Sequence, residues 1–187
     1  MSDFDRTKWE TRYQQGRGYE AEPHPFLAEV APLLPASGLV LDLAGGTGRH
    51  ARWFARRGYE VTLADISATA LAKATERAEA EGLSLDTVEI DLDTALPPGP
   101  WHVVVVSFFL VRGKIGGIVS RLAPGGLLVL IHPTMRNLER HEKPSEVWLL
   151  RDGELDEGLP GLTTLHHWEG WTTQNRHEVH YVGRRPA

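Results

Sequence analysis

The sequence has no cysteine among its 187 residues. Disulfide bonds, thiolate metal ligands, iron–sulfur clusters and a cysteine nucleophile are therefore excluded. Long apolar runs are missing too, since the longest, Val103–Val106 and then Phe108–Val111, is far shorter than the ~20 residues that span a bilayer. The N-terminus lacks the basic and then apolar pattern of a signal peptide. We therefore expect a cytoplasmic protein that does not bind a membrane.

An excess of basic charge is also absent. Lysine and arginine number 20 against 25 acidic residues, which gives a net charge of −5. Such a balance does not suit broad electrostatic capture of nucleic acid. Hydrophobic residues make up 41% of the chain and charged residues 24%, enough for a packed core. At this length we expect one domain spanning residues 1–187.

Helical and strand-like periodicities alternate along the first two thirds of the chain. The predicted strands cover residues 39–43, 59–64, 85–90, 102–107 and 127–132, and the predicted helices cover residues 25–34, 49–57, 67–81 and 112–121. This alternation is typical of a parallel sheet covered on both faces. We therefore predict an α/β fold, with residues 39–132 as its core.

The pattern changes after Pro133. Residues 134–161 are polar and rich in glycine and proline, and two further strands are predicted at 162–171 and 178–183. We expect residues 133–187 to supply a helix and an antiparallel hairpin that completes a mostly parallel, seven-stranded sheet. The first 38 residues are predicted to form N-terminal helices, of which residues 1–22 are a candidate lid.

A glycine-rich loop, Asp42–Gly48, joins a predicted strand to a predicted helix. Glycine allows sharp turns and close approach of a ligand to the backbone, so this is the context of a nucleotide-binding loop. Gly46–Ala51 also fits the degenerate G-x-G-x-x-G/A pattern of dinucleotide-binding proteins. An NAD-dependent oxidoreductase therefore remains an alternative.

Three acids follow successive strands and help to distinguish the ligands. Asp42 would repel a pyrophosphate but attract the ammonium and sulfonium groups of S-adenosylmethionine. Asp65 can accept hydrogen bonds from both ribose hydroxyls of either cofactor, and Asp91 can accept one from an adenine amino group. Together they favour S-adenosylmethionine at the carboxyl edge of the sheet.

These motifs resemble those of the class I S-adenosylmethionine-dependent methyltransferases. Leu41–Arg49 is similar to their glycine-rich motif, Tyr59–Ser67 to their acidic motif, and Asp91–Asp93 and Leu122–Gly126 to later ones. Ala44 stands where the family more often has glycine. The Trp9…Arg12-Tyr13 opening and the tail resemble the small tellurite-resistance and thiopurine methyltransferases.

The resemblance implies a Rossmann-like class I methyltransferase fold and transfer of a methyl group to a small molecule, with S-adenosylhomocysteine as the product. It implies that Gly46 and Gly48 face the methionine part of the cofactor and that Ile66 packs on the adenine. The residues predicted to bind the cofactor are Tyr13, Asp42, Ala44, Gly45, Gly46, Gly48, Asp65, Ile66, Asp91, Leu92 and Ser107.

Methyl transfer requires that nucleophile and methyl group be held in line and that water be kept out. An anionic nucleophile needs no base, whereas a hydroxyl usually does, and His132 is our catalytic candidate, ahead of His50. Candidate substrate contacts are Trp9, Arg12 and Phe108. Trp9, Tyr13 and Tyr19 form either a lid or a packed helix, and Arg12 or Arg17 would steer an anion.

Six of the nine histidines follow residue 131, which raises the question of a metal site. Adjacent residues of a strand face opposite ways, so His166 and His167 cannot chelate together, and His177 and His180 diverge as well. No third ligand has a matching spacing. We therefore predict no metal site. A non-catalytic S-adenosylmethionine-binding module remains a further alternative, and the acceptor atom and the choice between monomer and homodimer stay open.

Overall fold

The computed structural model describes residues 3–16 and 22–187. Its α-helices are α1 (Asp3–Gln14), α2 (Phe26–Val30), α3 (Arg49–Ala55), α4 (Ala68–Ala80) and α5 (Ile115–Arg121). Its strands are β1 (Leu39–Leu43), β2 (Glu60–Asp65), β3 (Asp86–Glu89), β4 (Trp101–Ser107), β5 (Leu122–Pro133), β6 (Thr163–Trp171) and β7 (His177–Arg184). The short 3-10 helices are Ala31–Leu33, Met135–Glu139 and Glu146–Trp148.

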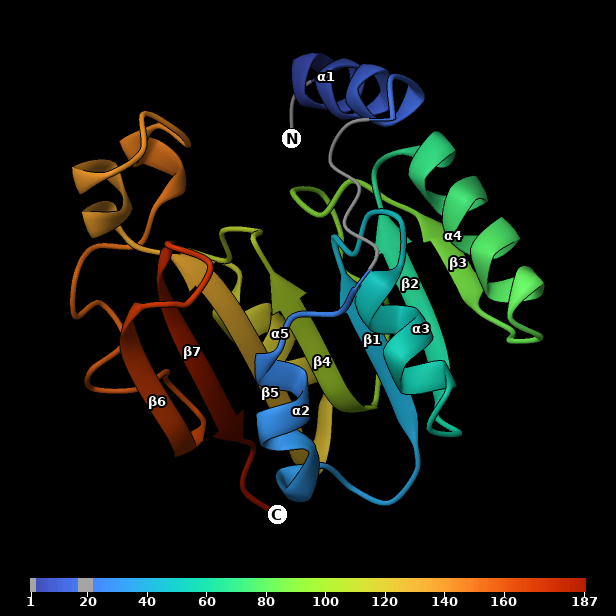
Figure 1. Cartoon of the computed structure of the whole chain (residues 1–187). Helices are drawn as coiled ribbons and strands as arrows, with labels where there is room; N and C mark the ends of the chain where they lie inside the picture. Colours follow the sequence, from blue (N-terminus) through green and yellow to red (C-terminus); the bar gives the residue numbers. More distant parts are fainter. Residues whose placement is uncertain (1–2, 17–21) are drawn as a thin grey trace.

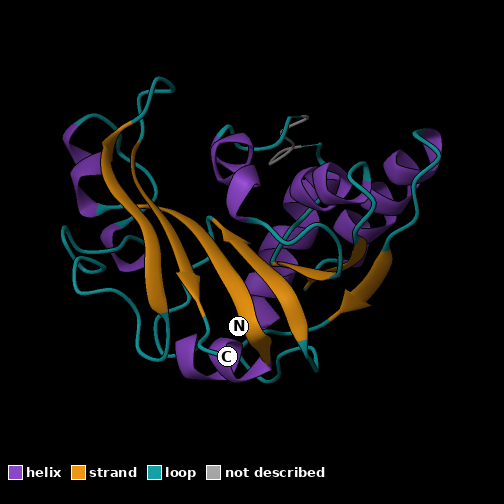
Figure 2. Ribbon diagram, turned by 90° about the horizontal axis from the view of Figure 1, so that it is seen from below, coloured by secondary structure: helices purple, strands orange, loops and turns teal. Residues whose placement is uncertain are grey.

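All seven strands form one sheet in the order β3-β2-β1-β4-β5-β7-β6 (Figure 1). The pairs from β3 to β5 are parallel, whereas β7 is antiparallel to both β5 and β6. The predicted α/β fold with its terminal antiparallel hairpin is thereby confirmed. Viewed from below, the strands fan into a twisted sheet (Figure 2). That one domain spans the whole chain stays a prediction.

Alternate residues of the central strands pack on opposite faces of the sheet, as the period of a strand requires. Val103 and Val105 of β4 pack with α2, α3 and α4 on one face. Val104 and Val106 pack with α5 and the segment around Leu150 on the other. In Figure 1, α2 and α3 lie in front of the sheet and α5 lies behind it. Burial on both faces explains the run of four valines.

The segment between β5 and the hairpin differs from the expectation of a C-terminal helix. It contains only the two short 3-10 helices Met135–Glu139 and Glu146–Trp148, which are separated by Pro144. Proline lacks the N–H that an α-helix requires, and the residue before it is disfavoured from helical conformation.

None of the helices in the described residues has the length and the apolar character that a membrane-spanning helix needs.

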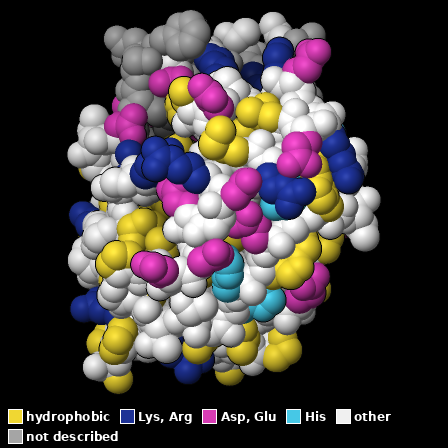
Figure 3. Space-filling view, turned by 90° about the vertical axis from the view of Figure 1, so that its left-hand side faces the viewer, with side chains coloured by type: hydrophobic (Ala, Val, Ile, Leu, Met, Phe, Trp, Pro, Cys, Tyr) yellow, Lys and Arg dark blue, Asp and Glu magenta, His cyan; other side chains and the backbone are white. Residues whose placement is uncertain are grey.

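Two segments lie at the end of the sheet where the parallel strands finish. Helix α1 lies above the ends of β1 and β2, and the segment that holds both 3-10 helices lies near the end of β5 (Figure 1). The face of the molecule toward β6 carries acidic and basic side chains interspersed with apolar ones (Figure 3). Because the parallel strands end between α1 and the segment with the two 3-10 helices, we expect a ligand site there.

Candidate functional site

A cavity of about 1090 Å³ opens at this end of the sheet. Its walls come from α1, the glycine-rich loop, the ends of β2, β4 and β5, the residues from Asn137 to Trp148, and the turn before β7. Ligand sites in open α/β sheets lie at this carboxyl edge. The cavity is therefore our candidate active site.

The glycine-rich loop approaches α1 closely. Gly46 has φ +56°, and a Cβ atom at this position would come within 2.5 Å of the Tyr13 hydroxyl. Gly48 has φ +74°, and its Cβ would come within 2.9 Å of Ala74 in α4. Ala44 also takes a positive φ, +56°, which costs an alanine about 1–2 kcal/mol. The glycine that is more common there in the resembling family would avoid this cost.

Asp65 connects the loop to β2. Its Oδ2 accepts a hydrogen bond from the Gly46 N–H at 2.9 Å, and its Oδ1 accepts one from the Ser67 N–H at 3.0 Å. The side chain lines the cavity although it is almost completely buried, and burial raises its pKa. It stands where a carboxylate would meet the hydroxyls of a cofactor ribose, a role that stays a prediction.

Asp42 lies beneath the loop and is not part of the cavity wall. Its side chain is fully buried, and Oδ2 accepts a hydrogen bond from the Ala51 N–H at 3.0 Å. Burial raises the pKa of Asp42 to about 7. The Ala51 N–H in the first turn of α3 holds Oδ2, while Oδ1 is buried without a hydrogen-bond partner among the described residues. The expected position of Asp42 near the cofactor's amino group stays a prediction.

Asp91 also lies outside the cavity wall, where its Oδ1 accepts a hydrogen bond from the Asp93 N–H at 2.8 Å. Its neighbour Leu92 and, after β2, Ile66 do line the cavity, and both are buried. These two apolar side chains are brought together as the predicted adenine contacts require. Gly48 faces α4 instead of the cavity.

Helix α1 covers the glycine-rich loop. Lys8, Trp9, Arg12 and Tyr13 line the cavity, and the rings of Trp9 and Tyr13 stack with centroids 5.9 Å apart. Tyr13 is buried, and burial together with the Asp65 carboxylate raises the pKa of its phenol. The predicted residues Arg17 and Tyr19 lie outside the described residues.

Glu10 fastens α1 to the start of α4. Its carboxylate accepts hydrogen bonds from the Ser67 hydroxyl at 2.6 Å and from the N–H and hydroxyl of Thr69. Arg6 adds a hydrogen bond at 2.7 Å to Glu89 beyond α4. Of the two arrangements that we predicted, α1 therefore packs on the domain and at the same time forms one wall of the cavity.

The ends of β4 and β5 form the far wall, with Ser107, Phe108 and His132. The Nε2 of His132 lies 2.8 Å from the carbonyl oxygen of Trp148, so Nε2 carries the proton. Its Nδ1 is buried without a hydrogen-bond partner among the described residues, and burial lowers the pKa of the ring to about 4. His132 is therefore a neutral and weakly basic group at pH 7.

Several basic residues of the cavity wall were not predicted. Lys8, Arg49, Lys143 and Arg176 line it in addition to the predicted Arg12. Arg49 directly follows the glycine-rich loop, so its position gave a signal that our sequence analysis did not use. Arg176 lies more than 120 residues later, and only the pairing of β7 with β5 brings it here.

Residues 40–126 match the family described as a methyltransferase domain. This match covers the loop, Asp65, Leu92 and Leu122–Gly126, which the structure places at the start of β5. Residues 40–126, just under half of the chain, therefore form a methyltransferase domain within the class I methyltransferase fold. The family prediction is thereby confirmed, and with it the cofactor, since S-adenosylmethionine is the methyl donor that defines this family.

Two curated relatives resemble part of this chain. The tRNA 5-carboxymethoxyuridine methyltransferase of Escherichia coli (strain K12) is 31% identical over 121 residues, which are 60% of this chain and 46% of the relative. The demethylmenaquinone methyltransferase of Thermus thermophilus is 37% identical over 100 residues, 49% of this chain and 46% of the relative. The chain thus spans about half the length of the curated relatives that it matches.

A solved structure, TehB from Haemophilus influenzae, resembles nearly the whole chain. It superposes with a TM-score of 0.74 and 21% identity, over 95% of this chain and 67% of TehB. At this identity the likeness shows the fold alone. The finer resemblance to tellurite-resistance and thiopurine methyltransferases therefore stays a prediction.

Proposed function

We propose that this protein transfers a methyl group from S-adenosylmethionine to a small-molecule acceptor by in-line displacement. The observation that carries the proposal is a single cavity with two different walls. The glycine-rich loop, Asp65, Ile66 and Leu92 line one part, and Phe108, His132 and Arg176 line another. One cavity can therefore hold a cofactor and an acceptor side by side.

The residues present suit S-adenosylmethionine. The glycine-rich loop brings backbone to the cavity wall, the Asp65 carboxylate lines the cavity, and Ile66 and Leu92 offer apolar surface for a base. The cofactor supplies an electrophilic methyl group on a sulfonium. We infer that Tyr13 and Trp9 of α1 keep water from this part of the cavity.

The reaction asks for little acid–base chemistry. The acceptor's lone pair forms the bond to the methyl carbon while the carbon–sulfur bond breaks, and its electron pair stays on the sulfur of S-adenosylhomocysteine. A base with a pKa near 4 is a poor proton acceptor at pH 7. His132 therefore suits an acceptor that is already anionic better than a neutral hydroxyl, and we assign it a role in shaping the cavity next to Ser107.

The size of the cavity and the charge of the chain favour a small acceptor. Sites for small molecules enclose ~300–1,000 Å³, and this cavity of about 1090 Å³ leaves room for the cofactor and one further small molecule. One relative acts on a tRNA nucleoside and another on demethylmenaquinone. The net charge of −5 disfavours the electrostatic capture of a whole tRNA.

Two measurements test the proposal. Calorimetry should detect binding of S-adenosylhomocysteine and no binding of NAD, and binding of NAD alone would instead support the oxidoreductase alternative. A screen with labelled S-adenosylmethionine should then transfer label to one class among carboxylic acids, thiols, metalloid oxyanions, catechols and amines, with bulk tRNA as a separate sample. Cofactor binding without transfer to any of these samples would support a non-catalytic binding module.

A further inference from the structure

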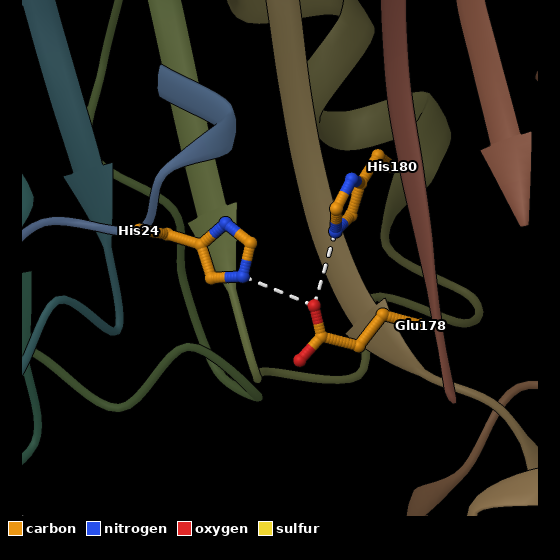
Figure 4. A group of neighbouring side chains, drawn as sticks. All are labelled: His24, Glu178 and His180. Atoms are coloured by element: carbon orange, nitrogen blue, oxygen red, sulfur yellow. Dashed lines mark hydrogen bonds and ion pairs between the residues drawn. The ribbon is translucent and has the colours of Figure 1, made fainter. Parts of the chain in front are cut away.

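A buried carboxylate with two histidine partners lies on β7 (Figure 4), where Glu178 pairs with Pro133 of the cavity wall. Glu178 is 0% exposed, and its Oε2 lies 3.0 Å from Nε2 of His24 and 3.0 Å from Nε2 of His180. Glu178 and His180 are two residues apart on one strand and so share a face. His24 reaches them from the residues before α2.

The cluster differs from our sequence-based expectation, because His180 does have further potential metal ligands beside it. The three donor atoms lie within 4.8 Å of one another. However, His24 Nδ1 accepts a hydrogen bond from the Phe26 N–H at 3.3 Å. The ring proton then sits on Nε2, the atom that a metal would need, and donates to Glu178. This arrangement favours a hydrogen-bonded triad over a metal site.

The triad holds an ionised carboxylate against an arginine. Burial raises the pKa of Glu178, but the hydrogen bonds from His180 and His24 outweigh it and bring the pKa to about 2. Both histidines use Oε2, so the other oxygen, Oε1, is left toward Arg176, whose Nη1 lies 4.0 Å away. Oε1 has no hydrogen-bond partner among the described residues, so this long ion pair places the charge of Glu178 beside Arg176, which lines the cavity.

Arg176 shares an aromatic platform with a second arginine. The guanidinium carbons of Arg176 and Arg49 lie 5.3 Å and 5.5 Å from the ring centroid of Phe108. All three residues line the cavity. The second cation also affects Arg49: burial and, after it, the positive charge of Arg176 lower the pKa of the Arg49 guanidinium to about 10. Two flat guanidinium groups on one ring are suited to planar anions.

Basic residues also outnumber acidic residues in the cavity wall as a whole. Among the described residues that line the cavity, Lys8, Arg12, Arg49, Lys143 and Arg176 are basic, whereas Asp65 and Glu142 are acidic. The chain as a whole has a net charge of −5. Positive charge is thus concentrated at the cavity, although the protein overall is acidic.

We propose that Arg49 and Arg176 form a subsite for a carboxylate or another oxyanion of the methyl acceptor. The inference rests on the proposed function, in that this cavity also takes the acceptor. Arginine binds carboxylate and phosphate groups through paired N–H donors, which fixes orientation as well as charge. Both guanidinium carbons lie within 5.5 Å of the Phe108 ring centroid, so this ring is a contact that the two arginines share.

The test uses small anions as probes, because it does not need the acceptor itself. Benzoate, neutral benzamide and inorganic phosphate are titrated into the full chain by NMR, with and without saturating S-adenosylhomocysteine. We expect benzoate to bind at least roughly tenfold more tightly than benzamide. Competition by phosphate would indicate an acceptor with a phosphate group, and its absence would indicate a carboxylate.

Two matched variants complete the test. R176Q should weaken benzoate binding by roughly tenfold or more and leave the affinity for S-adenosylhomocysteine unchanged. R184Q removes an exposed arginine at the last residue of β7 that is not part of the cavity wall, and it should behave as the wild type. Equal binding of benzoate and benzamide, or unchanged benzoate binding by R176Q, would overturn the subsite.

This design distinguishes a failure of the proposed function from a failure of the arginine subsite. Loss of S-adenosylhomocysteine binding in the wild type would contradict the proposed function. The titrations without that ligand would still decide whether the arginine pair binds an anion. Retained S-adenosylhomocysteine binding in R176Q also shows that the variant is folded.

Discussion

Gly46 lies at the closest contact between the glycine-rich loop and α1. We expect G46A to bind S-adenosylhomocysteine roughly tenfold or more weakly by calorimetry, because the new Cβ would come within 2.5 Å of the Tyr13 hydroxyl. The positive φ, +56°, adds a backbone cost of about 1–2 kcal/mol to folding. Affinity should thus fall by more than a loss of stability alone explains.

G58A is the matched control for this variant. Gly58 also has a positive φ, +83°, but a Cβ there would meet nothing within 4 Å. In urea unfolding, G58A should lose a free energy similar to the backbone cost in G46A, and it should keep its affinity for S-adenosylhomocysteine. If the two variants lost the same affinity, the contact between Gly46 and Tyr13 would not matter for the cofactor.

The acids show how far single residues can be predicted. The sequence placed Asp42, Asp65 and Asp91 correctly at strand ends, and the strand ends do meet at one edge. Which side chain turns into the cavity depends on local hydrogen-bond donors, however. Asp42 turns to the Ala51 N–H of α3 and Asp91 to the Asp93 N–H, and only Asp65 reaches the cavity.

Helix α1 is the element with the most direct control over the cavity. E10A should increase the rate of S-adenosylhomocysteine release by roughly three- to tenfold, because it removes the hydrogen bonds to Ser67 and Thr69 and a net ~1 kcal/mol. Stopped-flow displacement measures this rate.

T11A provides the comparison within the same helix. Thr11 is exposed on α1, so its replacement should leave the release rate unchanged. An E10A protein that releases S-adenosylhomocysteine at the wild-type rate would show that α1 does not act as a cover. Removing the whole helix is a less specific test, because it also removes the side chains of Trp9 and Tyr13 from the cavity.

The elements from β1 to β5 were predicted closely because their periodicity is strong and turn residues bound them. The segment of residues 134–161 was not, since its polar residues and prolines give no period. Its position follows from tertiary contacts, such as the hydrogen bond between His132 and the Trp148 carbonyl. The positions of Arg176 and of the triad could not be predicted from periodicity either. They depend on the pairing of strands that are distant in the sequence and on His24.

At the scale of the whole molecule, buried titratable groups have opposite effects on stability. His132 has a folded pKa of about 4, below its unfolded value of ~6.5, so stability is lost as pH falls through this window. Asp42 has a folded pKa of about 7, above its unfolded value, so stability is lost as pH rises toward 7. The wild-type curve between pH 5 and 7 is therefore the difference of two large effects.

Variants separate these effects, and urea unfolding at pH 5 and pH 7 measures them. From pH 7 to pH 5, protonation of His132 in the unfolded state should cost the wild type roughly 2 kcal/mol that H132Q does not lose. Over the same pH range, protonation of Asp42 in the folded state should stabilise the wild type by a similar amount, and D42N should lack this gain. The two variants should therefore differ from the wild type with opposite signs. Parallel pH curves for all three proteins would mean that neither group is held in the buried state that the structure describes.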